Sequence, residues 1–140
     1  MDRRDFMKAG MVSTAAGLVV PQAVMAESQD LLASPLAGGV FYTKDKPGRW
    51  AAKAPGHVPV VKSSGSLVMV TTPHEMNGYT HYIVKHLLLD AKMNVLGEHE
   101  FDPKNDTAPV SEFKVDGYKG PAYALSMCNK HDLWVTVFTL

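Results

Sequence analysis

The feature that most constrains the fold is a series of short apolar runs, each ended by a turn sequence before a helical period can develop. Turn signals such as Ser63-Ser64-Gly65, Asn77-Gly78 and Asp116-Gly117 separate these runs. Short runs with turns every 8–12 residues are typical of an antiparallel β-sandwich. The sequence therefore predicts an all-β domain of seven to eight strands, at residues 38–42, 58–62, 66–72, 82–89, 95–101, 110–115, 122–127 and 133–140.

One segment between the first two runs does not fit a strand. Residues 44–55 contain Pro47, Gly48 and Pro55 and are predicted to form a loop. The last run, by contrast, alternates regularly, which places its side chains on two faces of a strand. One face would carry Leu133, Val135 and Val137, and the other Trp134, Thr136 and Phe138.

The N-terminus has the layout of an export signal. Arg3 and Arg4 precede an apolar stretch at residues 9–20, and small residues up to Ala26 offer a cleavage point. The apolar stretch is too short to span a membrane as a helix. Its start, Arg-Arg-Asp-Phe-Met-Lys, resembles a twin-arginine signal, a type known for exporting folded proteins. We expect residues 1–26 to be this signal, residues 27–140 to be the domain, and the protein to be periplasmic or otherwise exported.

Composition excludes several functional classes. Lys+Arg 14 balance Asp+Glu 14, so no basic excess points to nucleic acid. The one cysteine excludes an intramolecular disulfide framework and any all-cysteine metal site. Six histidines beside that cysteine leave a mixed metal site open.

Three segments carry residues able to bind a metal. Cys128 and His131 share one short turn before the last strand, so both could reach one ion. His74 and His81 flank a loop that contains Asn77-Gly78, and His57 precedes a run that Pro59 marks as an edge or a bulge. Taken singly, each segment also fits a role without a metal: a buried thiol beside a surface histidine, exposed loop histidines, or a histidine at a strand end.

The other two histidines do not join this pattern. His86 lies within the run 82–89, on the strand face opposite to that of His81, and is expected to be half-exposed. His99 is expected to be a solvated hairpin residue.

Together the three segments resemble the iron domain of the superoxide reductases, also called desulfoferrodoxins or neelaredoxins. The resemblance covers roughly residues 50–140 and is most specific at Cys128-Asn129-x-His131-x-Leu133-Trp134. It implies an immunoglobulin-like β-sandwich of the one-iron form, since the family's rubredoxin-like domain is missing. It also implies a mononuclear non-haem iron held by His57, His74, His81, His131 and, axially, Cys128.

The implied activity is one-electron reduction of superoxide to hydrogen peroxide. Such an oxidoreductase needs an external electron donor, which the sequence does not identify. Neutral imidazoles leave a ferrous centre cationic and attractive to the anion, and a thiolate donates electron density to the metal. The sandwich edges would need covering, which is compatible with a homo-oligomer.

The sequence departs from the family pattern at three places. Pro55 and Gly56 stand where many members have Glu-Lys, the lysine helping to attract superoxide and deliver protons; Lys53 and Lys130 are candidates to replace it. Six residues separate His74 from His81, one more than is usual, and Asp132 replaces a common glycine.

Two other functions remain open. A blue-copper carrier also takes cysteine and histidine from one loop of an exported β-sandwich, but it uses two histidines and usually a methionine after the last one. A non-enzymatic periplasmic metal-binding or electron-transfer module is the second alternative, and the altered Pro55-Gly56 pair favours it.

Overall fold

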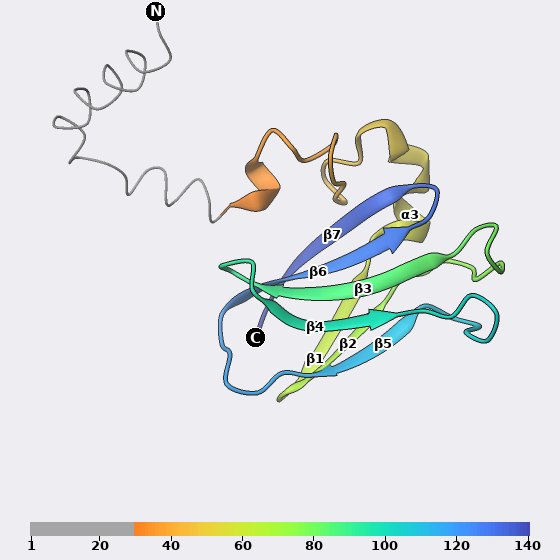
Figure 1. Ribbon diagram of the computed structural model, residues 1–140. Helices are drawn as coiled ribbons and strands as arrows, with labels where there is room; N and C mark the ends of the chain where they lie inside the picture. The colour runs from red at the N-terminus through yellow and green to blue at the C-terminus, as the bar shows by residue number, and fades with distance from the viewer. Residues whose placement is uncertain (1–29) are drawn as a thin grey trace, which may run out of the picture. The chain divides into compact units, whose positions relative to one another are not determined.

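The computed structural model describes residues 30–140, and the prediction for residues 1–26 lies outside them. The sandwich lies in the compact unit Leu32–Leu140 (Figure 1). Two 3-10 helices, η2 (Leu31–Ala33) and η3 (Gly48–Lys53), and the short helix α3 (Ala54–His57) precede the strands. The strands are β1 (Val60–Ser64), β2 (Leu67–Thr71), β3 (Ile83–Asp90), β4 (Val95–Glu100), β5 (Val110–Lys114), β6 (Pro121–Cys128) and β7 (Asp132–Thr139).

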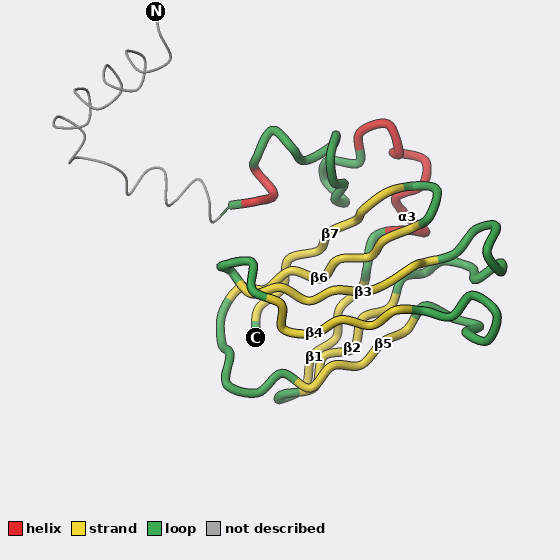
Figure 2. Tube along the Cα trace, viewed as in Figure 1, coloured by secondary structure: helices red, strands yellow, loops and turns green. Residues whose placement is uncertain are grey.

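The seven strands form two antiparallel sheets. One has the order β1-β2-β5 and the other β4-β3-β6-β7 (Figure 2). Central strand β6 is buried along nearly its whole length, whereas β2 and β5 alternate between buried and exposed residues. This alternation is expected of strands with one face on a core and one in water. The predicted all-β antiparallel sandwich is confirmed.

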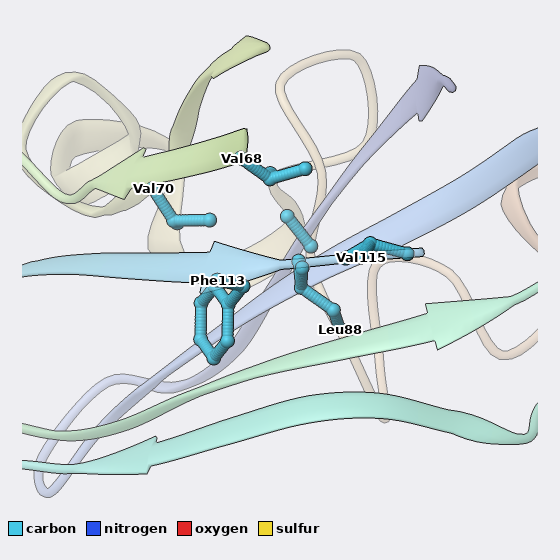
Figure 3. Close-up of a cluster of buried hydrophobic side chains, with 6 residues drawn as sticks. Val68, Val70, Leu88, Phe113 and Val115 are labelled. Atoms are coloured by element: carbon cyan, nitrogen blue, oxygen red, sulfur yellow. The ribbon is translucent and has the colours of Figure 1, made fainter. Parts of the chain in front are cut away.

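The apolar core joins the two sheets. Val68, Val70 and Phe113 from the three-stranded sheet meet Leu88 from β3, with Val115 alongside (Figure 3). All five are less than a tenth exposed. Burial of these side chains on facing sheets is what holds the sandwich together.

A layer of buried polar groups lies beside this core, which corrects the expectation for His86. The His86 side chain is fully buried rather than half-exposed. Its Nδ1 lies 2.7 Å from the Ser111 hydroxyl and its Nε2 lies 2.8 Å from the Thr72 hydroxyl, which pairs with Ser126 at 2.6 Å. Because Ser111 lies on β5 and His86 on β3, this network bridges the sheets. His99 is exposed, as expected.

Two further predictions are wrong. Residues 38–42 form no strand: Gly38 has φ of +88° and Val40 N–H donates to Leu36, so the chain turns there and makes only isolated bridges. Residues 44–55 are not simply a loop, because η3 and the start of α3 lie there. Pro55 fits the first turn of α3, where a backbone N–H has no helical partner anyway.

Strand direction brings the chemically interesting residues to one end of the sandwich. β1 begins just after His57, β2 ends just before His74, β3 begins just after His81, and β6 ends at Cys128. In Figure 1, α3, the loop after β2 and the β6–β7 turn lie at the same end of the sheets. Over residues 30–140, no helix is both long and apolar enough to cross a membrane.

Candidate metal centre

His57 ends α3 and is 4% exposed. Its Nδ1 lies 2.8 Å from the backbone carbonyl of Lys53, one turn earlier. A carbonyl only accepts, so Nδ1 carries the proton and donates it. The lone pair of His57 therefore sits on Nε2, the nitrogen that faces the other histidines.

The loop after β2 supplies His74 and His81. The Nδ1 of His74 donates to the Glu75 carbonyl, which leaves Nε2 free to bind an ion. Asn77 and His81 close a tight turn, in which each backbone N–H faces the other's carbonyl, and Gly78 adopts a φ of +52°. This turn accommodates the extra residue of the loop and brings His81 back to the cluster.

The β6–β7 turn supplies Cys128 and His131. The backbone N–H of Lys130 donates to the Cys128 sulfur at 3.5 Å, which stabilises negative charge on it. The Trp134 indole N–H donates to the His131 carbonyl at 2.9 Å and fixes the turn from the core side. Both ligand candidates are less than a tenth exposed.

Asn129 fastens this turn to the His81 loop. Its amide nitrogen donates to the carbonyls of Tyr79 and Thr80, at 3.4 and 3.1 Å, and its amide oxygen accepts the Tyr82 N–H at 3.0 Å. The two loops are therefore held in fixed relation before any ion arrives.

The four histidines and the cysteine converge on one point. Each offers one donor atom, and all five atoms lie within 4.8 Å of one another. Around the cluster, Nε2 of His74 lies 3.0 Å from Nε2 of His81, which lies 3.1 Å from Nδ1 of His131. That Nδ1 lies 3.1 Å from Nε2 of His57 and 3.6 Å from the Cys128 sulfur.

These separations fit a single transition-metal ion. Two imidazole nitrogens bound at right angles to one ion at about 2.1 Å lie about 3 Å apart. The protons of His57 and His74 are held on their far nitrogens by carbonyls, so the lone pairs of these two rings point into the cluster. Both lone pairs are therefore available to a cation bound there. Imidazole and thiolate donors suit iron, zinc or copper rather than magnesium or calcium. Four imidazoles are two more than a blue-copper site uses.

Three of the imidazoles lie in surroundings that favour the neutral ring. Burial lowers the pKa of His57 to about 4, although its bond to the Lys53 carbonyl acts in the opposite direction. Burial also lowers the pKa of His81 and of His131, and the neighbouring histidines add to the effect. Neutral imidazole is the metal-binding form, so these three histidines favour the form that binds a metal.

The two candidate lysines lie beside the cluster. The charges of Lys53 and Lys130 both lower the pKa of His131, and Lys130 also acts on His81. Both side chains are exposed. His86, by contrast, belongs to the buried network between the sheets and not to the cluster.

Sequence reasoning missed Arg49 and Trp50. Asp132 accepts hydrogen bonds from both, at 2.6 and 2.9 Å, and the Trp50 ring packs edge-on against His131 with 4.7 Å between centroids. The replacement of a common glycine by Asp132 was the available signal, since a carboxylate beside His131 implies a partner.

The comparisons with known proteins agree with this site. The family model for desulfoferrodoxin matches residues 49–137. A superoxide reductase (neelaredoxin) from Ignicoccus hospitalis is 26% identical, with a TM-score of 0.59, over 74% of this chain and 95% of that one. The one-iron superoxide reductase from Giardia intestinalis is 27% identical, with a TM-score of 0.52, over 61% of this chain and 98% of that one. No curated protein sequence matches.

The family match spans well over half of the chain and includes all five residues of the cluster. The solved structures share its sandwich. This chain belongs to the desulfoferrodoxin family.

Proposed function

We propose that this protein is a superoxide reductase, a mononuclear non-haem iron oxidoreductase that reduces superoxide to hydrogen peroxide. The observation that carries the proposal is the convergence of four imidazole nitrogens and one cysteine sulfur within 4.8 Å. Family membership and the names of its solved relatives support the same activity. One superoxide, one electron and two protons give one hydrogen peroxide.

His57, His74, His81, His131 and Cys128 would hold the iron. Bound as ferrous ion, iron would supply the electron that superoxide accepts. Since imidazole binds a metal in its neutral form, the iron-loaded site would carry net positive charge even after the thiolate is counted. Half-buried His74 and His81 face the solvent side, whereas His57, Cys128 and His131 form the buried wall.

The remaining steps use the chain's own groups. Lys53 and Lys130 add positive charge at the exposed rim and would attract the anion and supply protons from water. The carbonyls of Lys53 and Glu75 hold the imidazole protons of His57 and His74 away from the centre. These protons therefore remain on the protein, and the two that enter the product must come from solvent or the lysines.

The cellular setting follows from the N-terminal sequence. We propose that residues 1–26 are a twin-arginine-type signal, that residues 27–140 are the exported domain, and that the protein acts in the periplasm or another exported location. Export after folding would let iron be bound first, which matters because copper and zinc bind such ligands more tightly than ferrous iron. An electron donor protein would re-reduce the centre, and a homo-oligomer would cover the sheet edges.

One experiment tests the proposal. The chain is expressed with ample iron, its metal content is measured, and its oxidised form is examined for a visible thiolate-to-iron(III) charge-transfer band. We expect one iron per chain, a band that Cys128→Ser abolishes, and rapid reaction with superoxide without release of dioxygen. A chain that binds iron with this band but does not react with superoxide would instead be an electron-transfer module, the alternative that the Pro55-Gly56 pair favours.

A further inference from the structure

Asp132 adopts a backbone conformation that normally belongs to glycine. Its φ is +65°, in the left-handed region that residues with a side chain rarely occupy. Such a conformation has a cost that glycine would avoid. An aspartate at this position therefore needs a compensating interaction, and its carboxylate provides one.

The carboxylate of Asp132 holds a segment distant in sequence. One oxygen accepts hydrogen bonds from the Arg49 guanidinium at 2.6 Å and from the Trp50 indole N–H at 2.9 Å. Arg49 also donates to the hydroxyl of Tyr42 at 3.2 Å, and Tyr42 is buried. The contact thus joins the β6–β7 turn, η3 and the residues that flank the core.

The segment that Asp132 holds has little else to fix it. η3 contains no buried residue, has no side-chain cap, and departs from helical geometry at Trp50. A six-residue 3-10 helix is a weak structure by itself. Its close approach to the chain at Gly38 fixes only its first residue, Gly48.

Two residues of η3 touch the metal-binding cluster. The ring of Trp50 packs edge-on against His131, at an interplanar angle of 83°. The backbone carbonyl of Lys53, at the end of η3, accepts a hydrogen bond from Nδ1 of His57 at 2.8 Å. Fixing η3 therefore fixes the orientation of two of the four imidazole rings.

We propose that Asp132 is a positioning residue for the metal centre: through Arg49 and Trp50 it clamps η3 onto the β6–β7 turn and so orients the His131 and His57 rings. This role depends on one part of the proposed function, namely that the cluster binds a metal, and not on the reaction with superoxide. Groups that orient ligands from outside the coordination sphere typically change metal affinity 10- to 100-fold. An isolated exposed ion pair would have little effect on either affinity or order.

The variant Asp132→Gly distinguishes a positioning residue from an isolated ion pair. Glycine adopts the positive φ without cost, and it removes the carboxylate that holds Arg49 and Trp50. In the metal-free full chain we expect trypsin to cut after Arg49 and Lys53 at least several-fold faster than in the wild type. We also expect the dissociation constant for cobalt(II) to rise about ten-fold, although the urea midpoint stays within error. Asp132→Asn keeps an acceptor for Trp50 and should fall between. Asp116→Gly, at an exposed loop aspartate, is the matched control.

Trp50→Phe provides a second variant that keeps the ring and removes its hydrogen bond to Asp132. It should weaken cobalt binding in the same direction as Asp132→Gly, and by less. Unchanged cobalt affinity in Asp132→Gly would overturn the proposal, even if trypsin cuts faster, because the clamp would then be merely structural. Neither measurement uses superoxide, so a failure of the reductase activity leaves this test decisive.

Discussion

At the level of single residues, two lysines lie near the metal centre, Lys53 and Lys130. Neither stands directly before His57, where many family members have a lysine and this chain has Gly56. The charges of Lys53 and Lys130 both reach His131. We expect Lys53→Ala and Lys130→Ala each to lower the second-order rate with superoxide by about two- to five-fold and to weaken its dependence on ionic strength, because each removes a steering charge. Pulse radiolysis at low and high salt measures both effects.

Lys119→Ala is the control for this pair, because Lys119 is an exposed lysine in the loop before β6, at the end of that strand opposite to Cys128. Gly56→Lys tests the same idea by gain. A Cβ built at Gly56 meets only the Pro73 carbonyl, at 3.5 Å, so a side chain fits there. Gly56→Lys should restore the rate of Lys53→Ala. Wild-type rates in both alanine variants would exclude a role for either lysine.

The buried His86 gives a prediction about pH. Burial lowers its pKa to about 4, with the charge of His99 adding to the effect. Because the folded-state pKa lies below the unfolded value of 6.5, the neutral ring stabilises the fold above pH 6.5, and this stability is lost as the pH falls toward 4. The loss from His86 alone amounts to about 2 kcal/mol between pH 7 and pH 5.

Urea unfolding of the metal-free protein at these two pH values measures the effect. His86→Gln keeps hydrogen-bonding groups and removes the titration, so its free energy of unfolding should fall less from pH 7 to pH 5. The same change at His99, the exposed partner of His86 across the β3–β4 ladder, should keep most of the wild-type dependence, because burial rather than the charge of His99 is the larger cause of the lowered pKa. An equal pH dependence in His86→Gln and wild type would contradict the assignment.

At the level of elements, Asn129 couples the β6–β7 turn to the His81 loop. Asn129→Ala removes three hydrogen bonds between them. We expect the free energy of unfolding to fall by about 1–2 kcal/mol and cobalt(II) to dissociate faster, since only backbone bonds would then hold His81 near Cys128. Asn105→Ala, in an exposed loop with a local bond to Asp102, should change neither. Unaltered cobalt release in Asn129→Ala would show that the ion alone fixes the loops.

The elements also show where sequence patterns are informative. The β-rich run at residues 66–72, bounded by a turn signal, predicted β2, and alternation along residues 133–140 predicted β7, because successive side chains of a strand point to opposite faces. The helices between Gly48 and His57 were missed because they are too short to show a helical period and are held by tertiary contacts, those of Asp132 above all. Residues 38–42 were misassigned because Val40, Phe41 and Tyr42 are residue types that favour strands, whereas the positive φ of Gly38 makes the chain turn there.

At the scale of the whole molecule, motif spacing and family resemblance predicted which five residues form the cluster. They did not predict the contacts that orient these side chains. Periodicity alone did not predict the burial of His86, because that burial depends on Ser111 and Thr72, which the other sheet brings across the core. Likewise the η3 contact with His131 joins residues more than eighty positions apart, which no local pattern encodes.

The same long-range geometry would make a bound ion a further link between three segments at that end of the fold. α3 carries His57, the loop after β2 carries His74 and His81, and the β6–β7 turn carries Cys128 and His131, so a bound ion links all three. An ion that binds the folded chain alone stabilises it by mass action, about 4 kcal/mol at a thousand times its dissociation constant. For a domain near 100 residues this corresponds to a rise in Tm of about 15 °C or more.

Scanning calorimetry with and without cobalt(II) should show this rise in the wild type and in His86→Gln, but a much smaller one in Cys128→Ser. Equal Tm values with and without the ion would mean that the five donors do not act as one site, and the oxidoreductase proposal would fail with them.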